Sequence, residues 1–216
     1  MNFGLGQVDY SISIKCLSAC KYMLKLPAMK IYSQPVPSTK GYVFFASSIW
    51  KQEPMVNDWR KRFIRCAKTQ PGIRFEGGFC PRVDGLNFDP ENEMLPKRYA
   101  PKQFIQRASD SSINFNCPAV RGAISWRLGE LLNMGKLILT LPFRVKLANP
   151  LEHNVHCWYL DDISNCRNAL TDIQNSEPLV HRMQDNALDY FNRYCLPEKQ
   201  IDRIISTAFN LVPAGH

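Results

Sequence analysis

The 216-residue sequence contains no run that approaches the roughly 18 consecutive apolar residues of a membrane-spanning helix. It also lacks a secretory signal, because no basic side chain precedes Lys15, and Lys21 and Lys25 interrupt the apolar stretch that follows. Its eight cysteines include no CxxC pair, and a chain of this length does not need disulfides to hold its fold. We therefore expect reduced thiols and a cytoplasmic protein.

Long polar tracts and periodic glycine or proline are also absent, which excludes disordered and collagen-like chains. Hydrophobic residues make up 45% of the chain, so its length suits one domain with a core and a short appendage. Acidic residues are in the minority: 19 acidic against 27 basic side chains give a formal charge of +8. That charge favours an anionic partner, such as nucleic acid, a membrane surface or a phosphorylated small molecule.

The basic residues are not gathered in a tail. Even the most basic stretch, residues 59–65, interleaves its cations with apolar residues. This pattern is more typical of the solvated face of a helix than of a stripe that binds nucleic acid. We therefore expect no DNA partner, although the charge alone does not decide between a nucleic acid and a small phosphorylated ligand.

The common signatures of metal and nucleotide sites are absent as well. The sequence has no GxGxxG segment and no Walker lysine pattern. His153 and His156, together with Cys157, could suggest a metal site, but two imidazoles without a second cluster of ligands are weak evidence. We expect neither a metal ion nor another cofactor.

The order of the predicted elements indicates an α/β fold. From Gly41 onward, short apolar runs typical of buried parallel strands alternate with amphipathic helices. This alternation favours a Rossmann-like parallel sheet with helices on both faces. The predicted strands are residues 42–46, 73–76, 112–116 and 136–140, and the predicted helices are residues 54–69, 101–108, 122–134, 178–194 and 198–209.

The chain divides into one domain and two flanking segments. Residues 11–26 carry apolar side chains at helical spacing, and the proline-containing residues 34–38 are typical of a linker. The predicted organisation is therefore an amino-terminal helix and linker in residues 1–40, a Rossmann-like domain in residues 41–196 and a carboxy-terminal helix in residues 197–216.

Parallel sheets bind ligands at the carboxyl ends of their strands, so the loops at those ends hold the candidate residues. The loop after the first predicted strand contains Ser47, Ser48 and Lys51. These residues can hold an anion through hydroxyl groups, backbone amides and a cation, and an ordinary turn with a capping serine explains them equally well. The pair Gly77–Gly78, expected to end the second strand, is more typical of a turn.

The loop after the third predicted strand leads through Gly122 into a helix that carries Arg127 and Glu130. Their spacing of three places them on one face, beside the apolar stripe of Ile124 and Leu128. They form either a surface ion pair or a site in which the guanidinium holds a phosphate and the carboxylate holds sugar hydroxyls. In both cases we expect their replacement to leave the stability of the fold almost unchanged.

The segment of residues 112–139 resembles the donor-binding half of GT-B glycosyltransferases. Within that family the similar members are those of group 1 and the exostosin-like enzymes. In that family a strand, a glycine-containing loop and a helix with a glutamate before a Gly-Lys step build the nucleotide-sugar site. Here these features are Gly122, Glu130, Gly135 and Lys136.

Further matches extend the resemblance over most of residues 41–195, since residues 42–48 look like the strand that opens the family's donor half and residues 178–194 like its closing helix. The resemblance implies a single GT-B-type donor domain. It also implies metal-independent transfer of a sugar from a nucleotide-diphosphate sugar to a saccharide or other acceptor.

The resemblance also assigns roles to the candidate residues. Arg127 and Glu130 would be the catalytic residues, with Arg127 and Lys51 on the diphosphate and Glu130 on the ribose or donor sugar. Ser47, Ser48 and the amides around Gly122 would support them. Many retaining members carry another glutamate eight positions before the second, and the residue here is Gly122, so that pair is incomplete. Arg127 shortly before Glu130 looks more like the arginine-glutamate arrangement of exostosin-like members, and the resemblance favours neither retention nor inversion.

About forty residues precede Gly41, too few for the acceptor domain that such enzymes require. We therefore expect a donor half that works with a separate amino-terminal acceptor domain. The alternative function is a non-catalytic module that binds a nucleotide sugar or a nucleic acid.

Overall fold

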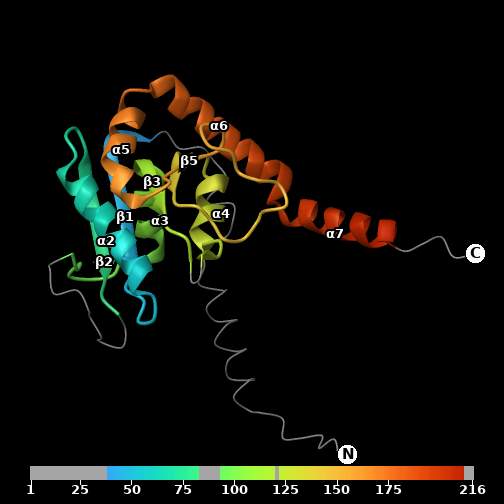
Figure 1. Cartoon of the computed structure of the whole chain (residues 1–216), viewed down its shortest axis with the longest axis horizontal. Helices are drawn as coiled ribbons and strands as arrows, with labels where there is room; N and C mark the ends of the chain where they lie inside the picture. Colours follow the sequence, from blue (N-terminus) through green and yellow to red (C-terminus); the bar gives the residue numbers. More distant parts are fainter. Residues whose placement is uncertain (1–37, 83–92, 120–121, 212–216) are drawn as a thin grey trace, which may run out of the picture.

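The computed structural model describes residues 38–82, 93–119 and 122–211. In these residues five parallel strands form one sheet in the order β2-β1-β3-β4-β5 (Figure 1). The strands are β1 (Thr39–Ser48), β2 (Arg74–Cys80), β3 (Ser111–Asn116), β4 (Ile138–Thr140) and β5 (Trp158–Tyr159). The predicted α/β class with a parallel sheet is confirmed.

Helices cover both faces of this sheet. The helices are α2 (Pro54–Thr69), α3 (Pro101–Asp110), α4 (Trp126–Asn133), the 3₁₀ turn η3 (Ile163–Asn165), α5 (Cys166–Gln174), α6 (Glu177–Tyr194) and α7 (Pro197–Leu211). Helices α2 and α5 pack on one face, α3 and α4 pack on the other, and α6 contributes to both cores. Helix α7 extends away from the sheet (Figure 1). No helix in the described part of the chain is long and apolar enough to cross a membrane.

Strand β1 is central because alternate side chains enter the two cores. Val43 and Phe45 belong to the core under α2 and α5, whereas Phe44 belongs to the core under α3 and α4. Phe63 of α2 stacks on Phe115 of β3 with their ring centroids 4.2 Å apart, and Phe45 meets both rings edge-on. Two-sided burial explains why this strand is a nearly continuous apolar run.

The helix predicted for residues 122–134 begins four residues later, at Trp126. Ser125 is its N-cap, because its hydroxyl oxygen accepts a hydrogen bond from the backbone N–H of Leu128. Ile124 therefore precedes the helix and is exposed, so its predicted place on the buried stripe is wrong. Gly135 ends the helix with a φ of 57°, as expected of a glycine at that position.

Two predicted features lie outside the described residues: the helix of residues 11–26 and the linker up to residue 37. Observed elements that have no counterpart among the predicted ones include the 3₁₀ turn η3. The two-residue strand β5 and helix α5 were not predicted either.

Gly77 and Gly78 lie inside β2, which corrects the expectation that they end it. Their φ angles are 138° and 147°, a region that side chains rarely adopt. A Cβ atom on Gly77 would lie 1.8 Å from the carbonyl oxygen of Phe45, and one on Gly78 would lie 2.4 Å from that of Glu93. The absence of side chains thus lets β2 lie against β1 on one side and the backbone around Glu93 on the other.

Replacing Gly77 by alanine should lower the free energy of unfolding by about 2–3 kcal/mol, because the new Cβ overlaps the backbone of β1 at a strained φ. Gly129→Ala is the matched control. No atom lies within 4 Å of the position of its Cβ, so alanine in the middle of α4 should stabilise the protein by about 1 kcal/mol. Urea unfolding of both variants measures the difference, and equal effects would contradict this account of β2.

Candidate functional site

The strand order places a topological switch point between β1 and β3. From β1 the chain crosses through α2 to β2 on one side, and through α3 it enters β3 on the other side. The connections leave the carboxyl ends of these two strands in opposite directions. In open parallel sheets this is where ligands bind, so the residues around Ser48 and Asn116 form the candidate site.

Three arginines converge on the backbone at the carboxyl end of β1. Arg127 of α4 donates to the carbonyl oxygen of Ala46 at 2.7 Å. Arg60 of α2 donates to that of Ser48 at 3.0 Å, and Arg82, which follows β2, donates to that of Ile49 at 2.8 Å. Because guanidinium groups are charged at any physiological pH, this arrangement concentrates positive charge at the switch point.

Arg127 lies between aromatic rings as well as on the strand end. Its guanidinium carbon is 4.7 Å from the ring centroid of Phe104 and 5.1 Å from that of Phe45. Burial lowers the pKa of Arg127 to about 10, and the charge of Glu130 acts against that shift. The side chain therefore stays cationic at neutral pH, in surroundings where a charge interacts more strongly than in water.

Arg60 is the residue of this site that the sequence interpretation missed. Its side chain is only 4% exposed and stacks on Trp50 at 4.2 Å from the ring centroid. Burial lowers its pKa, and interactions with Cys117 act against that shift. Among the described residues its Nε atom has no hydrogen-bond partner. Its position within the basic stretch had suggested a solvated helix face, and no local signal distinguished it from its neighbours.

A polar network at the end of β3 fixes the start of α4. The Asn116 side chain donates to Thr140 Oγ1 at 3.0 Å and accepts a hydrogen bond from Ser125, the N-cap residue. The side chains of Asn116, Ser125 and Thr140 are at least partly buried, and each of them has a hydrogen-bond partner. The network holds the first turn of α4, and hence Arg127, at the carboxyl edge.

The predicted residues of the first loop differ in exposure. Ser47 and Ser48 are partly buried at the end of β1, and the Ser47 hydroxyl donates to the Ser48 carbonyl oxygen at 3.4 Å. Lys51 is exposed in the turn that follows.

Gly122, the predicted residue of the loop after β3, lies in a turn. Its backbone amide donates to the carbonyl oxygen of Ala119 at 3.0 Å, and its φ of 76° shows that this glycine shapes the turn.

Arg127 and Glu130 do not behave alike, which corrects one interpretation of this pair. Arg127 reaches inward to β1, so it is not part of a surface ion pair, and its loss is not expected to be harmless. Glu130 is partly buried and accepts a hydrogen bond from Trp126 Nε1 at 3.2 Å. The structure thus brings Arg127 to the Ala46 carbonyl group, next to Ser47 in the sequence, while Glu130 lies one turn further along α4.

The basic stretch of α2 is divided rather than continuous. Arg60 is buried, and Arg62 forms an exposed ion pair with Asp58 at 3.5 Å. Arg65 lies 3.3 Å from the Glu93 carboxylate, which Lys68 also contacts at 2.5 Å. This arrangement disfavours the alternative in which α2 presents a stripe of cations to a nucleic acid.

The histidines of the β4–β5 connection accept hydrogen bonds from the backbone. His153 Nδ1 accepts from the Tyr159 amide at 3.0 Å, and His156 Nδ1 accepts from the Glu152 amide at 3.1 Å. Within residues 38–82, 93–119 and 122–211, no group of three or more His, Cys, Asp and Glu side chains is arranged to hold a metal ion.

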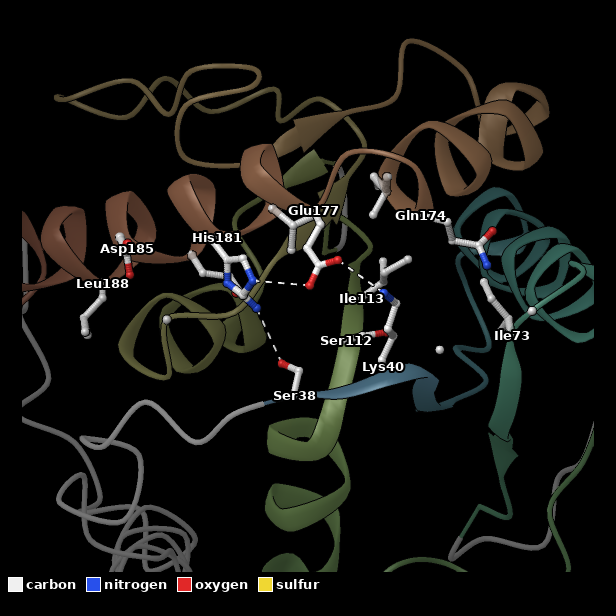
Figure 2. Close-up of a pocket in the computed structure, with 16 residues that line it drawn as sticks. Ser38, Lys40, Ile73, Ser112, Ile113, Gln174, Glu177, His181, Asp185 and Leu188 are labelled. Carbon is white, nitrogen blue, oxygen red and sulfur yellow. Dashed lines mark hydrogen bonds and ion pairs between the residues drawn. The ribbon is translucent and has the colours of Figure 1, made fainter.

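A cavity of about 630 Å³ lies at the opposite, amino edge of the sheet (Figure 2). Lys40 and His181 both approach the Glu177 carboxylate there, at 3.2 Å and 3.9 Å. Ser38 Oγ accepts hydrogen bonds from Lys136 at 3.3 Å and from Gln184 at 3.5 Å. None of the predicted site residues lines this cavity.

No protein-family model and no curated protein matches the sequence. Among solved structures, the chain is similar to TarM with a TM-score of 0.56 and 10% identity over 84% of this chain and 36% of that one. A TarM variant from S. aureus, in complex with Fondaparinux, alpha-GlcNAc-glycerol and UDP, gives a TM-score of 0.55 at 10% identity over the same shares. These likenesses confirm the predicted fold, that of the carboxy-terminal half of GT-B glycosyltransferases. The chain spans about a third of the length of TarM.

Arg127→Ala should lower the free energy of unfolding by about 2 kcal/mol, because it leaves the Ala46 carbonyl oxygen without its charged donor. Arg62→Ala is the control: it removes an exposed arginine paired with Asp58, and should cost no more than about 0.5 kcal/mol. Thermal and urea unfolding compare the two variants. A similar small loss in both would show that the contact between α4 and β1 does not stabilise the fold.

Proposed function

We propose that this chain is the donor-binding half of a glycosyltransferase. It binds a nucleotide-diphosphate sugar at the carboxyl edge of the sheet, and the sugar passes to a saccharide or other acceptor without a metal ion. The observation that carries the proposal is the convergence of Arg60, Arg82 and Arg127 on the end of β1, at the switch point of a GT-B-type fold.

The chemistry requires that negative charge be stabilised on a departing nucleoside diphosphate. Positive groups that are already fixed in place do this without reorganisation when the bond breaks. Arg127 has this property, because Ala46 and the ring of Phe104 hold its guanidinium. It lies in the first turn of α4, whose amide dipoles add partial positive charge at the same edge.

The remaining candidate residues supply weaker and more adaptable contacts. In this proposal Lys51 reaches the diphosphate from its exposed turn, and the hydroxyls of Ser47 and Ser48 donate to phosphate oxygens. Glu130 accepts hydrogen bonds from ribose or donor-sugar hydroxyls. Gly122 forms the turn before α4, and its own amide is already occupied by Ala119.

The acceptor site and the general base belong to another part of the enzyme. In the proposed organisation residues 41–196 form the donor domain, flanked by residues 1–40 and by residues 197–216, which include α7. A separate acceptor domain closes over the carboxyl edge. No DNA partner is proposed, since α2 presents divided and paired cations rather than a continuous stripe.

Titration calorimetry with uridine, guanosine and adenosine diphosphates and their sugars tests the donor site. A ligand at about 100 times its Kd should stabilise the protein by roughly 2.7 kcal/mol, which a thermal shift also detects. Lys51→Ala should weaken pyrophosphate and nucleoside diphosphates alike, by about tenfold, because it removes a charged contact. Lys40→Ala, an exposed lysine at the amino edge, should change neither affinity.

Two variants of Glu130 separate the proposed roles within the site. In particular, Glu130→Ala should weaken ligands that carry ribose and leave pyrophosphate nearly unchanged, because alanine removes the acceptor that only hydroxyl groups need, whereas Glu130→Gln keeps a carbonyl acceptor and should weaken them less. Failure of the whole panel to bind at millimolar concentration would overturn the donor site. Affinity for RNA that falls steeply with salt would favour the nucleic-acid module instead.

Chelation tests the metal-independent mechanism. EDTA should leave nucleotide binding unchanged, because arginine side chains and a helix terminus are proposed to carry the diphosphate charge. Binding that is lost with EDTA and restored by a divalent cation would contradict this proposal. Donor affinity without transfer, in the presence of a complementing acceptor domain, would favour a non-catalytic nucleotide-sugar module.

A further inference from the structure

A second group of basic residues lies beside the carboxyl end of β2. Residues 97–107 carry four cationic side chains and no carboxylate. These cations are Lys97, Arg98, Lys102 and Arg107, and all of them are exposed. They do not take part in the convergence of arginines on the end of β1, so the proposed donor site does not account for their charge.

These residues and helix α3 enclose a cleft of about 190 Å³. Lys97, Arg98 and Arg107 line it together with Tyr99 and Gln103, and no acidic side chain of the described residues belongs to its wall. Pockets that enclose a whole drug-sized ligand measure about 300–1,000 Å³. The cleft therefore suits one anionic group of a larger ligand.

Backbone contacts fix the cleft against β2. The Phe79 amide donates to the Glu93 carbonyl oxygen at 2.7 Å, and the Leu95 amide donates to the Phe79 carbonyl oxygen at 2.8 Å. Arg98 donates to the carbonyl oxygen of Pro81, the residue after β2, at 2.9 Å. The cleft is thus attached to the strand whose carboxyl end lies beside the proposed donor site.

The positive charge of the cleft is only partly compensated. Arg107 Nε lies 3.1 Å from the carboxylate of Glu76. In the described parts of the chain, neither Lys97 nor Arg98 forms an ion pair with a carboxylate. These two cations therefore remain available to an anion that enters from solvent.

Tyr99 adds an aromatic ring beside the cations. The ring meets Phe44 edge-on with their centroids 5.1 Å apart, and its hydroxyl group donates to Glu76 at 3.1 Å. Burial raises the pKa of Tyr99 to about 12, and the Glu76 charge acts in the same direction, so the phenol adds no negative charge at neutral pH. An aromatic side chain next to cations suits a sugar ring that carries an anionic substituent.

Helix α3 connects the cleft to the proposed donor site. Gln103 lines the cleft, and the next residue, Phe104, holds its ring centroid 4.7 Å from the guanidinium carbon of Arg127. Burial raises the pKa of Cys80 in β2, and the charges of Arg98 and Arg127 both act against that shift. The cleft and Arg127 thus lie on either side of Phe104 and Cys80.

We propose that this cleft binds an anionic substituent of the acceptor, and that the acceptor is a saccharide chain carrying phosphate or sulfate groups. The inference rests on the proposed function, since it takes the acceptor to be a saccharide. Arg98 offers a planar pair of donors to two oxygen atoms of the substituent, and Lys97 adds a mobile charge. The reacting hydroxyl group lies further along the same chain, in the separate acceptor domain.

Titration calorimetry of the full chain with dextran oligosaccharides of one length tests the cleft. Sulfated or phosphorylated dextran should bind, the tighter of the two identifies the substituent, and neutral dextran should not bind. Lys97→Ala/Arg98→Ala should weaken the charged saccharides by about tenfold or more, because two charged contacts are lost. Lys97→Glu, which leaves the contact between Arg98 and Pro81 in place, should also weaken them.

The matched control is Lys199→Ala/Arg203→Ala, which removes the same two charges from exposed positions of α7. Its affinity for the charged saccharides should stay within about twofold of wild type, because charges far from the ligand are screened by salt. Equal losses in the control and in Lys97→Ala/Arg98→Ala would overturn the inference. Tighter binding of an RNA oligonucleotide of the same charge would also overturn it.

Nucleotide binding separates this inference from the proposed donor site. Uridine, guanosine or adenosine diphosphate should bind Lys97→Ala/Arg98→Ala as tightly as wild type. An equal loss of nucleotide affinity would assign the cleft to the donor diphosphate and overturn the inference. Binding of nucleotides without binding of charged saccharides would refute the cleft alone, whereas the reverse result would refute the donor site alone.

Discussion

The carbonyl oxygens at the end of β1 impose the constraint on which this site depends. Strand β1 is buried on both faces, and at its carboxyl end the carbonyl groups of Ala46, Ser48 and Ile49 take hydrogen-bond donors from other parts of the chain. Arginine side chains from α2, α4 and the segment after β2 supply them. The contacts that hold the helices to the sheet therefore also collect positive charge at its carboxyl edge.

The same arginines therefore have two roles, since they hold the helices to the sheet and they supply the positive charge of the proposed site. A guanidinium has five N–H donors, and one bond to a carbonyl oxygen does not neutralise its charge. The aromatic surroundings of Arg127 and the stacking of Arg60 on Trp50 hold both side chains in a single orientation. A preformed cationic surface of this kind does not need to reorganise when a diphosphate binds.

Sequence patterns predicted correctly those helix boundaries that are set by residues within or next to the helix. Helix α2 spans residues 54–69 as predicted, since Pro54 favours the first turn of a helix and a Pro-Gly step follows Thr69. The start of α4 depends on Asn116, which ends β3 nine residues earlier and holds the capping Ser125, and no helical pattern contains that information. Likewise, the helical spacing placed Arg127 beside the apolar stripe, but its long side chain reaches from there to β1.

The two edges of the sheet differ in their fixed charge, which is mixed at the amino edge and positive at the carboxyl edge, and the proposed donor site rests on this difference. Helices α2, α4 and α5 end near the amino edge, where Gly72, Gly135 and Gln174 line the larger cavity, and α6 begins there at Glu177, so helix ends of both signs meet at this edge. The cationic Lys40 beside that cavity is balanced by Glu177 (Figure 2). At the carboxyl edge, α2 and α4 begin, and the arginines converge on residues 46–49. The volume of a cavity measures the room for a ligand, whereas the binding of a diphosphate depends on fixed positive charge, and that charge lies at the carboxyl edge.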